Sequence, residues 1–563
     1  MSGPRKTKTT PPTGTTRRSF FRRGGAAAAA LVGAPALALA ARGSRAIEGS
    51  VPFQHGVASG DPLADRVILW TRITLPSVNG TLKLTYTVAT DPALTNVVRR
   101  GAALTDADRD HTVKVDVTGL SAGTTYYYRF AFDDQVSPIG RTRTAPAGPL
   151  ARLRLAVVSC SNHAFGLFNA YRRIAERADL DAVVHLGDYL YEYGPNTYGS
   201  LRTPEPPNEM VTLSDYRLRH AQYKRDTDLQ AVHRQHPMVC IWDDHEITND
   251  AWRDGAENHQ PATEGDWATR VAVGLRAYYE WMPVRMPDAQ QPRRNQRAFG
   301  FGNLVDLVML EERLSERSQQ LPATIPTQFG NAFAQTGAFA DPARTLLGAE
   351  QEGWLAQRLR NSSARWKLIG QGVMFAQLKI VAAPNASGGG LFVNSDQWDG
   401  YQPARNRIYG IFEGAAGVPA VSNCVVLTGD IHSSWAADLS RDPNNPNTAS
   451  GGYNATTGEG AKAVEFVTTS ITSPGLNDPA GQTAAFLRSV NPHFKYIDFN
   501  RRGYMLLDVT PARVVGEWWY VDTVASASNV QTFGVAFEVQ DGTNRLVASA
   551  QTTPPSNPPA LAP

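Results

Sequence analysis

Four apolar segments of the chain end in residues that could hold metal ions. The groups are a thiol, carboxylates, a phenol and an imidazole, at Cys160, Asp188, Tyr191, Asp244, Asp430 and His432. One such residue alone is usually a capping or surface group. Four segment ends of this kind are stronger evidence for a functional site, because the carboxyl ends of strands in an α/β fold hold the active site. We therefore expect these side chains to converge on a metal centre.

The residue types indicate which metals this centre would hold. A carboxylate such as Asp188 can bridge two cations. A phenolate from Tyr191 binds only a strong Lewis acid such as Fe³⁺, and a thiolate from Cys160 favours a thiophilic transition metal. Asp244 and Asp430 are hard oxygen ligands suited to Ca²⁺, Mg²⁺ or Mn²⁺. The set predicts one redox-capable metal and at least one hard cation, which together could hold a phosphate ester and generate hydroxide.

An α/β body predicted over residues 150–540 positions these groups. Residues 153–159 and 181–186 are nearly continuous apolar strands, and residues 166–177 between them have a helical apolar face. This pattern predicts a βαβ unit with parallel strands. Further buried strands are predicted at 238–242, 304–310, 366–370 and 424–428. Helices are expected to cover the sheets.

A small all-β domain is predicted ahead of this body, over residues 50–146. Apolar and polar side chains alternate at 82–88, 112–117 and 126–132, with Gly, Ser and Asp turns between. The pattern is typical of a β-sandwich, and the Gly and Tyr spacing over 119–126 resembles a fibronectin type III-like module with a tyrosine corner. A Pro/Gly/Ala linker follows at 144–149. At the other end of the chain, the Pro-rich tail, 541–563, is predicted to be disordered.

Residues 1–41 are predicted to be a twin-arginine (Tat) export signal. Arg17 and Arg18 precede two phenylalanines, and a weakly apolar stretch rich in Ala and Gly follows. The stretch ends in a small-x-small cleavage pattern at 38–40. We expect passage through the Tat translocase to a secreted, periplasmic or cell-envelope location, with a membrane anchor as the alternative. No other long apolar run predicts a membrane span once the signal is removed.

Charge and cysteine content exclude two further classes of protein. Residues 1–41 hold seven of the 55 basic residues and none of the 52 acidic ones, so the rest of the chain is mildly acidic. The rest of the chain therefore lacks the excess of basic residues that nucleic-acid binding requires. Only three cysteines are present, which excludes a disulfide framework. Cys240 and Cys424 lie in apolar runs and are expected to be buried free thiols.

Seven separate motifs give the sequence a family resemblance. They occupy residues 55–62, 67–72, 185–191, 241–246, 347–351, 398–401 and 427–433. Together they resemble the PhoD-like alkaline phosphatase family of the calcineurin-like metallophosphoesterase superfamily, over residues 50–535. The resemblance implies a metallophosphoesterase β-sandwich flanked by helices. One departure is Glu312, which stands before Arg313 where the family pattern leads us to expect Asp.

The resemblance also implies roles for single residues. It implies Fe³⁺ held by Cys160, Asp188, Tyr191 and His432, and one or two Ca²⁺ near Asp188, Asp430 and Asp244, with Asn249 competing with Asp244 as the third ligand. The implied role of His245 is to protonate the leaving alkoxide or to contact phosphate; the alternative is a histidine that only orients a ligand. Arg253 could clamp a phosphate, with a surface ion pair as the alternative.

These observations predict an exported alkaline phosphatase that hydrolyses phosphomonoesters by metal-activated hydroxide, with phosphodiesters as further candidates. No Ser or Cys nucleophile with an adjacent base is evident, so a covalent phosphoenzyme is not expected. A phospholipase D-type phosphodiesterase on the same scaffold is the close alternative. A non-catalytic surface binding protein is the distant one, and the complete ligand set argues against it.

Overall fold

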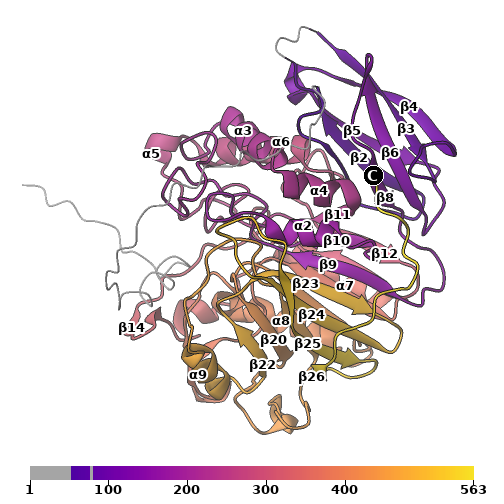
Figure 1. The fold of residues 1–563 in the computed structure, drawn as a ribbon. Helices are drawn as coiled ribbons and strands as arrows, with labels where there is room; N and C mark the ends of the chain where they lie inside the picture. The colour runs from indigo at the N-terminus through magenta and orange to yellow at the C-terminus, as the bar shows by residue number, and fades with distance from the viewer. Residues whose placement is uncertain (1–51, 76–79) are drawn as a thin grey trace, which may run out of the picture.

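Two large β-sheets form the centre of the molecule (Figure 1). The structure is a computed structural model that describes residues 52–75 and 80–563. The predicted export signal therefore lies outside the described residues. Among the residues described, no helix combines the length and the apolar character needed to cross a membrane.

The larger sheet has ten strands and contains the predicted βαβ unit. Its order is β26-β25-β24-β23-β9-β10-β11-β1-β2-β5. The bounds are β1 Val57–Gly60, β2 Arg66–Arg72, β5 Thr112–Thr118, β9 Leu153–Val158, β10 Ala182–His185, β11 Pro237–Cys240, β23 Arg502–Val509, β24 Arg513–Val521, β25 Gln531–Gln540 and β26 Leu546–Ser549. β9, β10 and β11 run parallel, and Val158, His185 and Cys240 lie side by side at their carboxyl ends.

The second sheet has seven strands, in the order β12-β13-β16-β19-β21-β20-β22. The bounds are β12 Arg297–Phe301, β13 Val305–Met309, β16 Trp366–Gln371, β19 Cys424–Thr428, β20 Ser434–Leu439, β21 Ala463–Val467 and β22 Phe494–Asp498. β13, β16, β19 and β21 are parallel. Two small hairpins accompany the sheets, β14 Ile325–Thr327 with β15 Gly330–Ala332, and β17 Lys379–Ala382 with β18 Gly390–Phe392.

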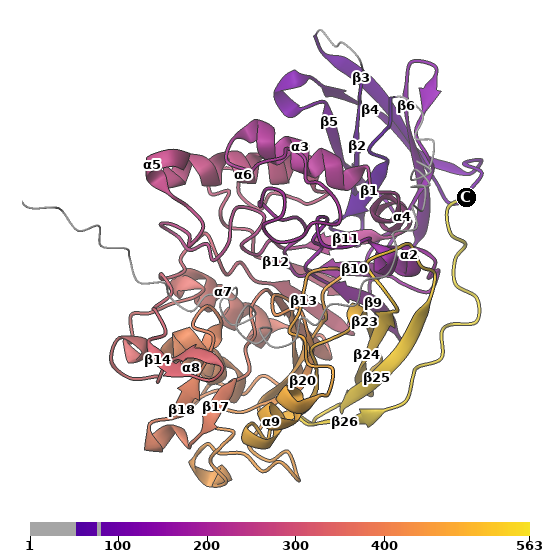
Figure 2. The same cartoon turned by 60° about the vertical axis from the view of Figure 1, so that its left-hand side comes forward.

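The two sheets pack face to face, and helices cover their outer faces (Figures 1 and 2). In β9, Leu155 and Val157 belong to the core between the sheets, whereas Ala156 and Val158 face the helices. Burial on both faces explains why this strand is almost continuously apolar. The helices are α2 Asn169–Ala175, α3 Leu213–Lys224, α4 Thr227–Gln235, α5 Pro261–Glu264, α6 Trp267–Trp281, α7 Gly348–Asn361, α8 Gln402–Glu413 and α9 Gln482–Val490. The predicted β-sandwich flanked by helices is confirmed.

The N-terminal strands also form a β-sandwich, as predicted, but one of its layers belongs to the larger sheet. Its second layer contains β3 Leu82–Ala89, β4 Val97–Thr105, β6 Thr125–Phe132, β7 Gln135–Val136 and β8 Gly140–Arg143. The Tyr126 hydroxyl accepts a hydrogen bond from Ser121 N at 2.8 Å, which is the predicted tyrosine corner. The first layer, β1-β2-β5, joins the larger sheet because β1 pairs with β11. The two domains thus share main-chain hydrogen bonds as well as a linker.

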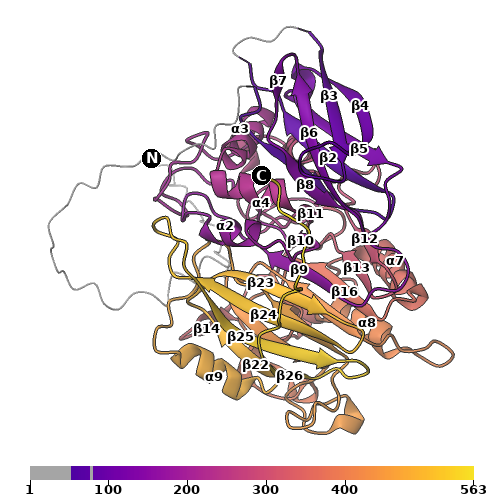
Figure 3. The ribbon, with the colours of Figure 1, turned by 45° about the vertical axis from the view of Figure 1, so that its right-hand side comes forward.

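The prediction of a disordered tail from residue 541 is wrong. Leu546–Ser549 is strand β26 of the larger sheet. The rest of the tail runs along the body to the N-terminal strands (Figure 3), where Ala562 N donates to Gln235 Oε1 at 2.8 Å and Ala560 O accepts from Tyr127. Backbone groups of the tail thus form hydrogen bonds with residues elsewhere in the chain. Composition alone does not reveal such partners.

The helix predicted at 166–177 is shorter than expected. α2 covers Asn169–Ala175, and Leu167 N just before it donates to Val524 O at 2.7 Å. The six predicted strands of the body coincide with β9, β10, β11, β13, β16 and β19. Their ends differ by about two residues at most, which is the usual uncertainty of such boundaries.

Candidate active site

Sharp turns after three strands aim the predicted ligands at a common centre. Cys160, Asp188 and Asp430 follow β9, β10 and β19, and all three adopt left-handed backbone angles, with φ of 61°, 55° and 62°. Non-glycine residues seldom occupy this region, and such residues cluster at functional sites. Cys160 N donates to Gly187 O at 3.1 Å, so the first two turns are bonded to each other.

Glycine is required beside one of these turns. Gly187 has φ of 102°, and a Cβ atom there would lie 2.5 Å from the Asp243 Cβ atom. The loop after β10 and the loop after β11 can therefore approach only because Gly187 has no side chain. This approach brings Asp188 to the carboxylates that follow β11.

The four residues of the predicted iron site lie together in the structure. Ligand atoms of Cys160, Asp188 and His432 are all within 4.8 Å of one another, and the three side chains are buried. The Tyr191 hydroxyl donates to Asp188 Oδ2 at 2.9 Å and lies 3.1 Å from His432 Nε2. His432 Nδ1 donates to Pro474 O at 2.7 Å, so Nε2 is the nitrogen left to bind a metal.

Two further candidate groups adjoin this one. Asp188, Asp244 and His245 form the second, and Asp243, Asp244 and Asp430 form the third, each with ligand atoms within 4.8 Å. Asp188 belongs to the first and second groups, and Asp244 belongs to the second and third. The groups are therefore continuous, as expected where one carboxylate bridges two cations.

The carboxylates of the third group are suited to hard cations. Burial raises the pKa of the Asp243 carboxyl well above its usual range; Arg313 lowers it, and the neighbouring Asp244 and Asp430 carboxylates raise it further. Asp243 Oδ2 is buried and has no hydrogen-bond partner among the described residues. Several carboxylates this close together need positive charge, which Arg313 supplies only in part. The donor set of thiol, phenol, imidazole and carboxylates fits a transition metal beside hard cations.

His245 has a strong carboxylate partner. Its Nδ1 donates to Glu192 Oε2 at 2.6 Å, and both side chains are almost fully buried. Burial by itself lowers the pKa of His245, but the Asp244 and Glu192 carboxylates outweigh it and raise this pKa to about 10. The protonated imidazole is thus favoured when no cations are bound, and cations beside it would act in the opposite direction.

Two predicted site residues have partners outside the three ligand groups. Asn249 Nδ2 donates to Glu257 Oε2 at 3.1 Å, a bond that leaves the amide oxygen available as a ligand. Arg253 forms an ion pair with Asp254 at 2.8 Å, and half of its side chain is exposed to solvent. The structure therefore shows the surface ion pair for Arg253, which was the alternative to a phosphate clamp.

Three residues that support the site were not among the predicted site residues. Arg313 bonds Asp396 at 2.8 Å and reaches Asp430 at 3.4 Å. Glu246 accepts from Tyr189 N at 2.6 Å and from Asp243 N at 2.9 Å, and so ties the loops after β10 and β11 together. Glu192 is the third. A signal existed for Glu192 and Glu246, since each directly follows a predicted site residue.

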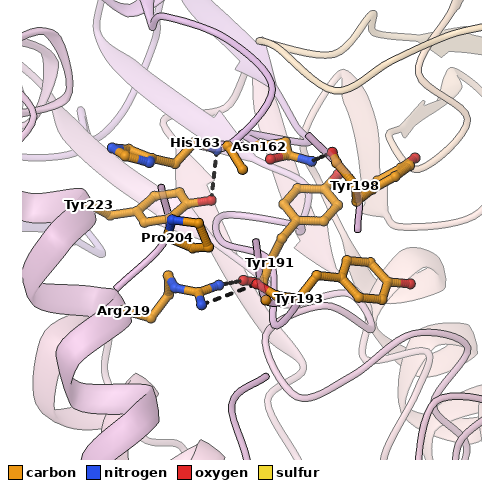
Figure 4. A pocket seen from close by; sticks show the side chains of 10 residues that line it. Asn162, His163, Tyr191, Tyr193, Tyr198, Pro204, Arg219 and Tyr223 are labelled. Atoms are coloured by element: carbon orange, nitrogen blue, oxygen red, sulfur yellow. Dashed lines mark hydrogen bonds between the residues drawn. The ribbon is translucent and has the colours of Figure 1, made fainter. Parts of the chain in front are cut away.

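Aromatic side chains line a small cavity beside Tyr191 (Figure 4). It encloses about 10 Å³, enough for one water molecule, and Tyr193, Tyr198 and Tyr223 contribute to its wall. Arg219 at its floor donates to Tyr193 O at 3.2 Å. Because Tyr191 lines it, the cavity adjoins the candidate metal site.

Two packed sheets, with acidic and soft ligands gathered at their strand ends, place this chain among the metallophosphoesterase-type hydrolases. Residues 155–518 match the family described as PhoD-like phosphatase, and residues 38–146 match its N-terminal domain. The chain therefore belongs to the PhoD-like phosphatase family. The predicted family is confirmed, and with it the prediction of a phosphoesterase.

Two individual proteins support this assignment. The chain is 37% identical to alkaline phosphatase D of Bacillus subtilis (strain 168) over 481 residues, which cover 82% of this chain and 76% of that one. A solved structure described as PhoD superimposes with a TM-score of 0.78 at 33% identity, covering 90% of this chain and 93% of that one.

Proposed function

We propose that this protein is an exported alkaline phosphatase that hydrolyses phosphomonoesters with one Fe³⁺ and one or two Ca²⁺. The observation that carries the proposal is the continuity of the three ligand groups through Asp188 and Asp244. Cys160, Asp188, Tyr191 and His432 would hold the iron. Bound cations would supply the positive charge that holds a phosphate ester and lowers the pKa of water.

The oxygen ligands for calcium are proposed to be Asp188, Asp244 and Asp430. The proximity of Asp244 to Asp243 and Asp430 in one group, and to Asp188 in the other, supports it over Asn249. A carboxylate is also the stronger ligand for a hard cation than an amide oxygen. Arg313 lies between Asp396 and Asp430 and would hold the carboxylates in place.

His245 is proposed to donate a proton to the departing oxygen of the ester. Glu192 occupies Nδ1, so Nε2 is the nitrogen that can act. A ring nitrogen of His245 lies within 4.8 Å of ligand oxygens of Asp188 and Asp244, at the centre where the ester would bind. Proton donation to a leaving group typically contributes ~10²- to 10⁴-fold to the rate.

Substrate comparison tests the proposed activity against its alternatives. Purified protein should be assayed with p-nitrophenyl phosphate, bis(p-nitrophenyl) phosphate and phosphatidylcholine under the same conditions. A phosphatase turns over the monoester fastest, whereas a phospholipase D-type enzyme would favour phosphatidylcholine. Binding without turnover of any of the three would favour the surface binding protein.

Export through the twin-arginine pathway is also proposed, and it gives a direct prediction. Replacing both Arg17 and Arg18 with Lys should trap nearly all of the protein inside the cell. The receptor reads a pair of planar guanidinium groups, and the lysine ammonium cannot reproduce that fork. The measurement is the fraction of the protein recovered outside the cytoplasm.

The neighbouring pair Arg22 and Arg23 provides a matched control. Replacing these two with Lys makes the same chemical change in the same segment and should leave export intact. If the Arg17 and Arg18 variant is exported as well as this control, the Tat assignment is wrong.

A further inference from the structure

We infer that Glu192 is a positioning residue for the reaction, acting through His245; the inference rests on the proposed function. Glu192 is fully buried, and its two carboxylate oxygens have separate partners. Oε2 accepts from His245 Nδ1 at 2.6 Å. Oε1 accepts from Asn249 N at 2.9 Å and from Asn258 Nδ2 at 3.0 Å.

The partners of Oε1 fix the orientation of the carboxylate. Asn249 N and Asn258 Nδ2 are both donors, and Thr248 Oγ1 lies 3.2 Å away as a third neighbour. A buried carboxylate held this way can rotate little, because rotation would leave buried donors without an acceptor. Oε2 is therefore directed at Nδ1 of His245.

This orientation determines which nitrogen of His245 carries chemistry. A carboxylate accepts only, so Nδ1 must carry a hydrogen, and Nε2 is the nitrogen free to exchange a proton with a leaving group. The ring itself lies against Tyr191, with centroids 4.2 Å apart. Packing and the Glu192 bond together fix the ring relative to Asp188 and Asp244, as a productive proton transfer requires.

Glutamine at position 192 would reverse the hydrogen-bonding pattern. Its carbonyl oxygen must remain with the Asn249 and Asn258 donors, because an amide NH₂ there would meet two donors. The NH₂ group must then face His245 and donate to Nδ1. The hydrogen of the neutral ring would then lie on Nε2 in place of Nδ1, and the bond by which Oε2 orients the ring would be lost.

Leaving-group dependence separates this role from a merely structural one. Nitrophenolate is a weak base and departs without a proton, whereas an alkoxide needs one. In Glu192→Gln protein with unchanged metal content, kcat/KM for glycerol 2-phosphate should fall ~10²-fold, while kcat/KM for p-nitrophenyl phosphate should fall less than about threefold. A variant that was only destabilised or poor in metal would lose activity on both esters alike.

Glu209→Gln is the matched control. Glu209 also accepts from Asn258 Nδ2, at 3.2 Å, but it does not contact His245. This variant should keep the ratio of the two rates. In a His245→Ala background, Glu192→Gln should cause no additional change in that ratio, because the effects of residues that act as one unit are not additive.

The outcomes are distinguishable. Equal slowing on both esters, or an additional change of the ratio in the His245→Ala background, would overturn the role of Glu192. Inactivity of the unaltered, metal-replete protein on both esters would instead overturn the proposed phosphatase function. Selective loss on the alkyl ester, absent in the control, supports the inference.

Discussion

Serine in place of Cys160 is expected to remove the iron, any visible colour and most of the activity. A thiolate binds a transition metal and gives a sulfur-to-metal charge-transfer band; a serine hydroxyl has a much higher pKa and little affinity for such ions. Loss of an outer partner of a metal ligand already costs 10- to 100-fold, so loss of a direct ligand should cost at least ~100-fold. Metal analysis, the visible spectrum and turnover of p-nitrophenyl phosphate provide the measurement.

The chain offers a matched control for this variant. Cys240 is also a buried free thiol, at the end of β11 in the same sheet, but it belongs to none of the ligand groups. Cys240→Ser should keep its iron and its rate, and the free energy of unfolding should fall by only about 1 kcal/mol. A Cys160→Ser protein that is as active and as rich in iron as this control would remove Cys160 from the metal site.

Removal of calcium is expected to abolish turnover reversibly while iron and colour remain. Hard oxygen ligands hold Ca²⁺ exchangeably, whereas thiolate and phenolate hold Fe³⁺ tightly. Calcium would also stabilise the fold, by about 2.7 kcal/mol when its free concentration is 100 times its dissociation constant. EGTA should therefore lower the melting temperature together with the activity, and added Ca²⁺ should restore both.

Two variants locate the calcium that EGTA removes. Asp244→Asn should raise the calcium concentration needed for half-maximal activity at least ~10-fold, because it removes a charged ligand. Asn249→Ala should shift it less than about threefold, because the proposed calcium ligand at this position is Asp244. A larger shift in Asn249→Ala than in Asp244→Asn would make Asn249 the ligand. Activity that EGTA does not affect would exclude calcium as the second metal.

The strands and the residues at their ends could be predicted because both depend on local sequence. A strand buried on both faces is nearly continuously apolar, as β9, β10 and β19 are apart from Arg154, His185 and Thr428. The polar residue that ends such a run is then conspicuous, and parallel pairing brings several ends to one edge. Cys160, Asp188 and Asp430 were found in this way.

The remaining features depend on contacts between distant parts of the chain. The pairing of β1 with β11 joins residues about 180 positions apart and merges the predicted domains. The tail is held by Gln235 and Tyr127, which its Pro-rich composition cannot reveal. Of the two interpretations for Arg253, a phosphate clamp and a surface ion pair, the structure shows the ion pair, with its own neighbour Asp254.

The proposed mixed-metal site is tested by the metal content of protein isolated from the exported fraction, measured beside its phosphomonoester turnover. We expect one iron and one or two calcium ions for each active chain, with turnover proportional to the amount of both metals. Active protein that holds no iron, or whose rate does not follow its metal content, would contradict the proposed site.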